Sequence, residues 1–351
     1  MKNTTTRRGF IKQVAATGVG LTIGGMSFKA TSAKSYANIM GSNERVNMAV
    51  MGTNGRGAGM ARNFQSRKDV EMRYVCDVEE KALAKGVAAV KKVGGNPKTE
   101  KDIRKILEDK NIDAILVTAP DHWHAPATIM ACQAGKHVYC EKPCSHNPHE
   151  GELSLAAARK YNRVVQVGAQ RRSWPGLTEG IEALHNGVIG KVHFAKAWYT
   201  NNRKSIGFGK EIPAPSTIDF DLWQGPAPRR SYRDNLIHYN WHWFWHWGTG
   251  EALNNGTHEI DVVRWGLGLD FPTAVSSEGG RFRYKDDWET PDTQTIDIRF
   301  GDDCLVTWEG RSCNSRDTEG RDRGVIFYGE GGALETGHNG YRYFRYEEQA
   351  G

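Results

Sequence analysis

The feature that most constrains the fold is an apolar segment that runs directly into a glycine-rich turn. Residues 46–51 have the composition of a buried parallel strand, and residues 52–57 (Gly-Thr-Asn-Gly-Arg-Gly) lead into a helix predicted to begin near Ala58. The N-terminus of such a helix can bind the pyrophosphate of a dinucleotide. Asn54 replaces the middle glycine of G-x-G-x-x-G, and asparagine tolerates positive φ better than most residues. The sequence therefore predicts a dinucleotide-binding domain.

An acidic residue at the end of the next predicted strand gives a second signal. This strand is predicted over 70–77 and ends at Asp77, 20 residues after Gly57. A carboxylate in that place can accept both ribose hydroxyls of NAD, and it repels the 2′-phosphate of NADP. Asp77 could instead cap the following helix, and Arg56 could pair with a 2′-phosphate. We expect NAD as the cofactor and keep NADP as the alternative.

Strands and helices alternate after this point. Five strands separated by helices imply an α/β fold with a doubly wound parallel sheet, and ligands bind at the carboxyl ends of its strands. We expect this nucleotide-binding domain over residues 44–170. Besides the two strands above, strands are predicted over 114–118, 137–141 and 164–167, and helices over 125–134 and 149–161.

The N-terminus has the three-part plan of an export signal. The pair Arg7 and Arg8 precedes a mildly apolar run over 14–23 and small residues over 30–33. Paired arginines indicate the twin-arginine route. A disordered basic terminus and a short anchor are the alternatives, but the run is too short and too rich in Gly and Thr to span a bilayer. We expect residues 1–34 to be a signal peptide for the twin-arginine export machinery, and the protein to be periplasmic or otherwise exported without a lasting membrane anchor.

The charge of the chain belongs to this N-terminal segment. Residues 1–34 contain six Lys and Arg and no Asp or Glu, so they account for the whole formal charge of +6. The remainder is neutral, which argues against nucleic acid or an anionic membrane as a partner. It is also too long for one ordinary core, so two domains are expected.

The cysteines do not suggest a metal site. Cys76, Cys132 and Cys140 fall in predicted strands or an apolar helix, where buried free thiols are expected. Cys140 and Cys144 form C-x3-C, but Pro143 and the absence of a second pair argue against zinc.

Two longer patterns are more specific. Residues 118–143 contain Thr118, His124, Gly-Lys-His-Val at 135–138 and Glu-Lys-Pro at 141–143, and residues 248–261 contain Asn254 and His258. These segments resemble the T-P-x-x-x-H…A-G-K-H-V-x-x-E-K-P block and the G-G-G-x-x-x-D-x-G-x-H-x-x-D helix of the Gfo/Idh/MocA family (glucose–fructose oxidoreductase, inositol dehydrogenase and MocA). The resemblance covers nearly everything after residue 45 and points to the exported twin-arginine branch.

The resemblance implies a Rossmann domain followed by an α/β domain with an open, mostly antiparallel sheet. This second domain, over 171–351, would bind substrate and form the oligomer interface, because relatives often build a dimer or tetramer on that sheet. Relatives also continue beyond the abrupt end of this chain, which leaves open that it is a fragment. The expected strands cover 191–200, 273–284, 293–300, 304–309 and 325–328.

Hydride transfer from an alcohol needs a group that takes the hydroxyl proton. The resemblance assigns this chemistry to Lys142, and His258 is its natural partner because an unperturbed imidazole titrates near neutral pH. Asn254 stands where relatives carry Asp, and an amide cannot act as a base. Proton removal is therefore predicted to rest on His258, with Lys142 assisting. The alternatives are a solvated lysine and a capping or core histidine.

The predicted contacts of the cofactor come from the glycine turn, from strand ends and from the Glu-Lys-Pro block. The resemblance places Glu141 and Gln170 beside the nicotinamide. The full set is Gly52, Asn54, Gly55, Arg56, Gly57, Asp77, Thr118, Pro120, His124, Glu141, Lys142 and Gln170.

Aromatic residues suggest a sugar site. Four Trp, two His and one Phe occupy positions 241–247, and aromatic faces can pack on pyranose rings. Packing into a domain interface is the alternative. The loop at 221–228 resembles the W-x-G-P-A-P loop of the family's exported, sugar-handling branch. The predicted substrate-binding residues are Lys142, Arg171, Trp241, Trp245 and His258, although Arg171 could equally be an ordinary surface arginine.

The leading functional hypothesis is an NAD(P)-dependent oxidoreductase acting on a hydroxyl of a sugar, polyol or glycoside. Because no NAD pool exists outside the cytoplasm, an exported enzyme must hold its cofactor tightly and recycle it. A second hypothesis is a glycosidase that works by transient oxidation and elimination. A third is a non-catalytic sugar- or NAD-binding protein, for which Asn254 is the best support.

Overall fold

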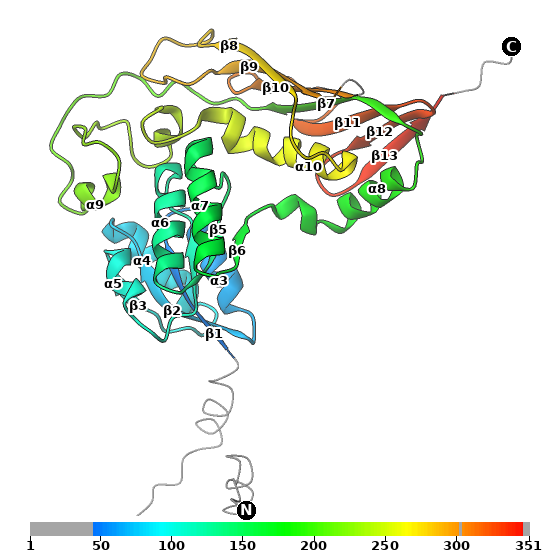
Figure 1. The fold of residues 1–351 in the computed structure, drawn as a ribbon. Coiled ribbons are helices and arrows are strands. Elements are labelled where there is room, and N and C mark those ends of the chain that lie inside the picture. The colour runs from blue at the N-terminus through cyan, green and yellow to red at the C-terminus, as the bar shows by residue number, and fades with distance from the viewer. Residues whose placement is uncertain (1–44, 302–303, 347–351) are drawn as a thin grey trace, which may run out of the picture. The chain divides into compact units, whose positions relative to one another are not determined.

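The computed structural model describes residues 45–301 and 304–346, and the predicted signal peptide lies outside them. Two sheets organise this part of the chain (Figure 1). Among the described residues, no helix is long and apolar enough to cross a membrane.

The first sheet has six parallel strands in the order β3-β2-β1-β4-β5-β6, as a doubly wound fold requires. Helix α3 packs against α4, and α6 against α7. The strands are β1 (Val46–Met51), β2 (Val70–Cys76), β3 (Lys98–Glu100), β4 (Ala114–Val117), β5 (His137–Cys140) and β6 (Val165–Val167). The helices are α3 (Arg56–Gln65), α4 (Glu80–Lys91), α5 (Ile103–Leu107), α6 (Asp121–Gln133) and α7 (Pro148–Lys160).

Apolar clusters cover both faces of this sheet. In β1, Met48 and Val50 belong to one cluster of buried residues, whereas Ala49 and Met51 belong to another. Because successive side chains of a strand point to opposite faces, the two clusters lie on the two sides of the sheet. The largely apolar sequence of the central strands follows from this two-sided burial.

The second sheet has seven strands in the order β13-β12-β11-β7-β10-β9-β8, and all neighbours are antiparallel except β7 and β10. Helices α8 and α10 pack on it. The strands are β7 (Val192–Thr200), β8 (Ala274–Gly280), β9 (Thr293–Phe300), β10 (Cys304–Arg311), β11 (Arg323–Gly329), β12 (Gly332–Thr336) and β13 (Tyr341–Arg345). The helical elements are η1 (Gln170–Ser173), α8 (Pro175–His185), α9 (Phe220–Gln224), η2 (Asn240–Trp243), the π-helical η3 (Ala252–Gly256) and α10 (Thr257–Leu267).

The predicted fold class is confirmed, with differences in detail. Strands β3, β12 and β13 were not predicted, and α6 begins at Asp121 instead of residue 125. The expected burial of Cys76, Cys132 and Cys140 as free thiols is also confirmed.

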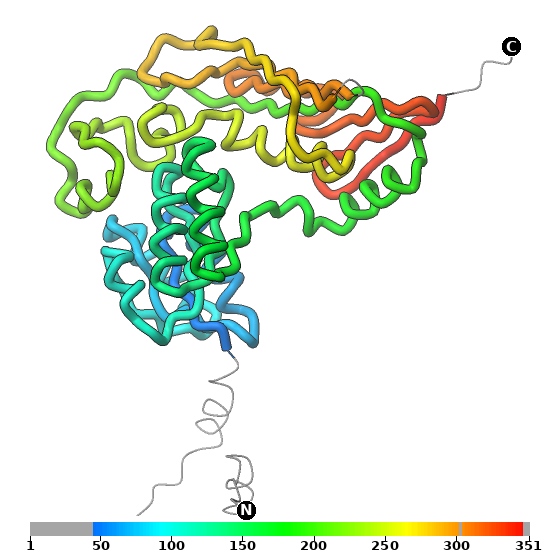
Figure 2. Tube along the Cα trace, in the orientation of Figure 1, coloured from blue at the N-terminus to red at the C-terminus, as the bar shows by residue number. Residues whose placement is uncertain are grey.

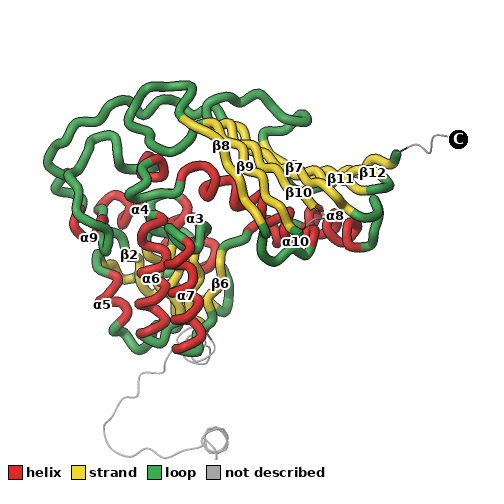
Figure 3. The backbone as a smooth tube through the Cα atoms, turned by 45° about the horizontal axis from the view of Figure 1, so that its top comes forward, coloured by secondary structure: helices red, strands yellow, loops and turns green. Residues whose placement is uncertain are grey.

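The long connection between β7 and α10 is mostly loop (Figure 3). It leaves the second sheet and returns to the edge of the first domain (Figure 2). There it forms an antiparallel bridge in which Glu79 faces Ile218. The backbone N–H of Glu80 donates to Thr217 O at 3.0 Å, and that of Asp219 donates to Val78 O at 3.0 Å.

Candidate functional site

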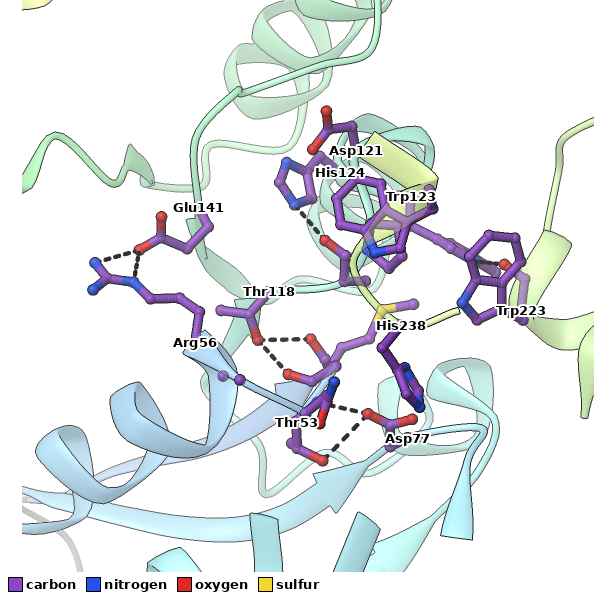
Figure 4. A pocket seen from close by; sticks show the side chains of 18 of the residues that line it. Thr53, Arg56, Asp77, Thr118, Asp121, Trp123, His124, Glu141, Trp223 and His238 are labelled. Atoms are coloured by element: carbon purple, nitrogen blue, oxygen red, sulfur yellow. Dashed lines mark hydrogen bonds and ion pairs between the residues drawn. The ribbon is translucent and has the colours of Figure 1, made fainter. Parts of the chain in front are cut away.

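A cavity of about 410 Å³ lies at the carboxyl ends of β1, β2, β4 and β5. The sheet order reverses between β1 and β4, and open α/β sheets bind ligands at such a switch point. Figure 4 shows its lining side chains. The second domain also contributes to the wall, with Leu222, Trp223, His238, Tyr239, Trp241, His242, Asn254 and His258.

The glycine turn forms the floor of the cavity. Gly52 has φ +86°, and a Cβ there would lie 2.7 Å from the backbone of Ala119. A Cβ on Gly57 would lie 1.8 Å from Gly52 O, so strand and helix approach too closely for any side chain. Gly55 faces open space. Helix α3 begins at Arg56, two residues earlier than predicted, which leaves its first N–H groups directed at this end of the cavity.

Asp77 lines the same end of the cavity, near His238 (Figure 4). Its Oδ2 accepts the backbone N–H of Thr53 at 2.6 Å, and its Oδ1 accepts that of Glu79 at 3.0 Å. Burial raises the pKa of Asp77, and these hydrogen bonds oppose the shift. The alternative role as a helix cap falls to Glu79, whose side chain accepts from Ala82 N at the start of α4.

Arg56 points away from Asp77. Its Nε and Nη2 donate to Glu141 Oε1 at 3.0 and 2.9 Å (Figure 4). The Nη2 also donates to Gln170 Oε1 at 2.5 Å. The guanidinium is therefore held beside β5 and not where a 2′-phosphate would attach. This arrangement favours NAD over NADP.

Lys142 follows β5 and reaches across to the second domain. Its Nζ donates to Asn254 Oδ1 at 3.0 Å and also to the backbone oxygen of Asn254. Burial lowers the pKa of Lys142, and the carboxylates of Asp121, Glu141 and Glu251 oppose the shift. The ammonium is thereby made easier to deprotonate than that of an exposed lysine.

His258, on α10, lines the cavity with Lys142 and Asn254. Burial lowers its pKa to about 3, and the positive charges of Lys142, Arg323 and other cations add to the effect. The imidazole is therefore neutral at physiological pH and a weak base. This low pKa disfavours the predicted role of His258 as the group that removes the proton, because positive charges act on the imidazole in the folded chain.

His124 lines the cavity, but its ring nitrogens bond to the backbone. Nδ1 lies 2.5 Å from Pro143 O, and Nε2 lies 2.7 Å from Ala119 O. Burial would lower the pKa of His124, but Cys140, Asp121 and the Pro143 carbonyl raise it to about 10. A doubly protonated ring can donate to both carbonyls, so its polar atoms hold the Glu-Lys-Pro turn in place.

Two predicted substrate residues lie elsewhere. Arg171 is buried, with Nη2 3.3 Å from Glu259 Oε1, and it does not line the cavity. Trp245 is 56% exposed and also lies outside it. The other predicted residues all line the cavity, including Thr118, whose hydroxyl donates to Gly52 O at 2.5 Å, and Pro120.

We call the segment over 217–242 the clasp, and of its cavity residues the sequence predicted only Trp241. Besides the bridge to Val78–Glu80, the Trp223 carbonyl accepts the indole N–H of Trp123 at 2.9 Å, and His122 Nε2 lies 2.9 Å from the same oxygen. Trp223 belongs to the loop whose resemblance was noted. For His238 and Tyr239 the only available signal was the density of rings.

Similarity to known proteins agrees with this geometry. The family model "Oxidoreductase family, NAD-binding Rossmann fold" of Gfo/Idh/MocA matches residues 46–169, and its "C-terminal alpha/beta domain" model matches residues 190–329.

Among similar proteins, a myo-inositol 2-dehydrogenase of Thermotoga maritima is 31% identical over 173 residues, which are 49% of this chain and 47% of that protein. A glycosyl hydrolase family 109 protein of Stenotrophomonas maltophilia is 27% identical over 257 residues, 67% of this chain and 56% of that protein. This chain thus spans about half the length of the curated relatives it matches.

The structure of a levoglucosan dehydrogenase in complex with NADH and levoglucosan has the same fold, with a TM-score of 0.66 at 19% identity, covering 87% of this chain and 77% of that one. The glycine turn, the Glu-Lys-Pro block and the two matching domain models together show that this chain belongs to the Gfo/Idh/MocA oxidoreductase family, with an NAD-binding Rossmann domain.

Proposed function

We propose that this protein is an NAD-dependent oxidoreductase that oxidises a secondary hydroxyl of a sugar or polyol. The observation that carries the proposal is one continuous cavity with the glycine turn and Asp77 at one end and Lys142 and His258 in its wall. The chain is similar to an inositol dehydrogenase and to a levoglucosan dehydrogenase, and this similarity supports a polyol or sugar as the substrate.

The first domain fits the cofactor. The N–H groups of the turn at 54–57 would hold the pyrophosphate, Asp77 the adenosine ribose, and Glu141 and Gln170 the nicotinamide end. The absence of a side chain at Gly52 and Gly57 allows the required tight turn, and the open space above Gly55 leaves room for a ligand. When bound, NAD⁺ supplies the acceptor for the hydride.

Lys142 is the proton acceptor in this proposal. Asn254 accepts two N–H bonds of Nζ through its side-chain and backbone oxygens. A neutral amine has two N–H bonds, so its lone pair is left for the hydroxyl proton of the substrate. The O–H bond would break toward Nζ as the carbon gives up its hydride to the bound cofactor, which would leave a carbonyl and a protonated Lys142.

Two side chains would position the substrate. Neutral His258 can hydrogen-bond the reacting hydroxyl without competing for its proton. Trp241 adds an aromatic ring to the wall, and its stacking on His242, with ring centroids 3.6 Å apart, fixes the orientation of the indole.

We further propose that the protein is exported by the twin-arginine route and works in the periplasm with a retained cofactor. The pair Arg7 and Arg8 with the apolar run after it supports export. The clasp supports retention of the cofactor, because it contributes part of the cavity wall. Homo-oligomers through the second sheet are proposed from exposed apolar side chains on its strands, such as Val275 of β8 and Leu305 of β10.

A glycosidase that oxidises, eliminates, adds water and re-reduces is the second candidate. The observation that favours it is the similarity to glycosyl hydrolase family 109 proteins over two thirds of this chain. The route has no net redox change, and it would begin with the same deprotonation by Lys142.

One experiment separates the two candidates. The protein is purified without added cofactor, and nicotinamide absorbance is followed as free sugars, polyols and aryl glycosides are offered. Reduction of bound NAD by a free sugar or polyol, without bond cleavage, supports the oxidoreductase. Release of the aglycone without net reduction contradicts it and supports the glycosidase.

A further inference from the structure

A buried carboxylate lies next to the Lys142–Asn254 pair without lining the cavity. Glu251 is 3% exposed, and its oxygens accept hydrogen bonds from Arg203 Nε at 2.6 Å, Ser312 Oγ at 3.2 Å and Asn254 Nδ2 at 3.2 Å. Asn255 Nδ2 donates to it as well. Because Glu251 does not reach the cavity, it cannot touch a substrate there.

The Asn254 side chain connects Glu251 to Lys142. Its Nδ2 donates to Glu251, and its Oδ1 accepts from Lys142 Nζ at 3.0 Å. An ionised carboxylate only accepts hydrogen bonds, whereas an amide has a donor end and an acceptor end. Glu251 therefore determines which end faces Lys142, since the reversed amide would set oxygen against oxygen and N–H against N–H.

We infer that Glu251 is a positioning residue for the Lys142 base: it orients Asn254 and supplies, one helical turn earlier, the negative charge that an Asp at position 254 would supply. The inference rests on the proposed function, because it concerns the same lysine. The π-helical η3, which follows Glu251 directly, places Asn254 between the carboxylate and the amine.

Charged and titratable groups on several elements act on Lys142. Glu251 acts through Asn254, Asp121 lies on α6, Glu141 adjoins the lysine, Arg56 lies on α3, and His258 lies on α10. The Glu251 charge raises the pKa of Lys142 against the effect of burial. Since only the neutral amine accepts a proton, this pKa sets the acidic limb of the pH profile.

The test is the pH dependence of kcat for the holoenzyme with a sugar or polyol that it oxidises. Glu251→Gln keeps the size of the side chain but removes the charge and leaves one acceptor oxygen in place of two. We expect kcat to fall about tenfold to a hundredfold, KM to change less, and the acidic limb to move to lower pH. The limb moves down because the ammonium loses a stabilising negative charge.

Glu335→Gln is the matched control. Glu335 is another buried carboxylate of the second domain, 4% exposed, and it binds Arg321 and Arg342 at 2.8 and 2.7 Å. It does not line the cavity. This variant should lose comparable stability but leave the pH profile unchanged.

The double variant Glu251→Gln/Asn254→Asp exchanges the amide and the carboxylate. It restores a complementary donor and acceptor pair and moves the charge beside Lys142. We expect it to recover most of the lost kcat and to move the acidic limb above its position in Glu251→Gln. In an Asn254→Ala background, Glu251→Gln should lower kcat by less than it does in the native chain.

Three results would overturn the inference: an unchanged acidic limb in folded Glu251→Gln, no recovery in the exchanged variant, or full additivity with Asn254→Ala. If Glu251→Gln does not fold, the exchanged variant still decides through its kcat and acidic limb relative to those of the native chain. Failure of the proposed function would be recognised by a different result, because Lys142→Ala would then keep its activity.

Discussion

At the scale of single residues, the site depends on opposing effects at Lys142. Burial favours the neutral amine, and three nearby carboxylates favour the ammonium. A lysine that alternates between these forms can take a proton and later release it, as a dehydrogenase requires in each cycle. His258 lacks this balance, because burial and the neighbouring cations both lower its pKa.

Lys142→Met should lower kcat by about a hundredfold to ten-thousandfold, because the proton acceptor is lost. Bound NAD should remain, since the glycine turn and Asp77 are untouched. Sugar-dependent reduction of bound NAD measures the first effect, and nicotinamide absorbance of the purified protein measures the second. Lys136→Met is the control: Lys136 is also buried, but its Nζ donates to Asp109 O at 2.7 Å, away from the cavity. Equal loss in both variants would contradict the role of Lys142.

Gly57→Ala should abolish cofactor binding and cost about 1–3 kcal/mol of stability. The new Cβ would meet Gly52 O at 1.8 Å and Thr118 Oγ1 at 2.4 Å, so the turn would have to open. Gly59→Ala, two residues along α3, meets nothing within 4 Å outside its own helix. It should stabilise the protein by about 0.5–1 kcal/mol. Urea unfolding and NAD titration compare the two, and a tolerated Gly57→Ala would refute the tight-turn argument.

The motifs identified the first-domain part of the cavity, because its residues follow strand ends at fixed spacings. Arg171 illustrates what they could not give. Its neighbour Gln170 lines the cavity, but the Arg171 side chain turns into the interior to meet Glu259. A sequence does not show that the side chains of two adjacent residues point in opposite directions. Here the backbone of η1 determines which of the two faces the cavity.

At the scale of elements, η3 and α10 carry the second-domain part of the site. The π-turn inserts one extra residue into the helix, and such insertions often occur at functional sites. Asn254 and His258 both line the cavity, four residues apart on one helix face, while Leu253 between Glu251 and Asn254 stays 40% exposed.

Deletion of Leu253 should convert the π-turn to regular α-helix and rotate Asn254 and His258 together by about 100° relative to Glu251, away from their places in the cavity. Activity should fall to the level of Lys142→Met, whereas far-ultraviolet circular dichroism should show unchanged helix content. Leu253→Ala keeps the chain length and should remain active. An active deletion variant would show that the π-turn has no role in the site.

Regular elements were predictable where burial on both faces leaves a short apolar run, as in β1 and β4. Strand β3 has only three residues, Lys-Thr-Glu, and it forms because its backbone pairs with β2. Strands β12 and β13 likewise depend on pairing with β11 and with each other. Helix α6 starts early because His122 and Trp123 bond to the clasp, a contact distant in sequence.

At the scale of the whole described molecule, the cavity wall comes from two domains. The first supplies the turn, Asp77 and Lys142, and the second supplies the clasp, Asn254 and His258. We therefore expect contacts between the clasp and the first domain, such as the bond between Trp123 and the Trp223 carbonyl, to slow release of the cofactor.

Trp223→Ala should speed NAD release, because it removes the ring that packs on Trp247 and Phe220 at the base of the clasp. The loss of a buried tryptophan costs about 3–5 kcal/mol, so a control must share that cost. Trp198→Ala removes a fully buried tryptophan of β7 that does not line the cavity. Thermal unfolding should show similar losses, and only Trp223→Ala should release NAD faster in stopped-flow dilution. Equal release rates would argue against a clasp.

The bridge between Glu79 and Ile218 also has a consequence during protein synthesis. All six parallel strands are complete by Val167, whereas the clasp is translated later. Domains generally fold in chain order as they leave the ribosome. We therefore expect that the nascent first domain is able to bind NAD before the clasp is made, and that the clasp then packs against an occupied site. Because Ile218 lies about fifty residues after the last parallel strand, cofactor binding can precede closure of the clasp during synthesis.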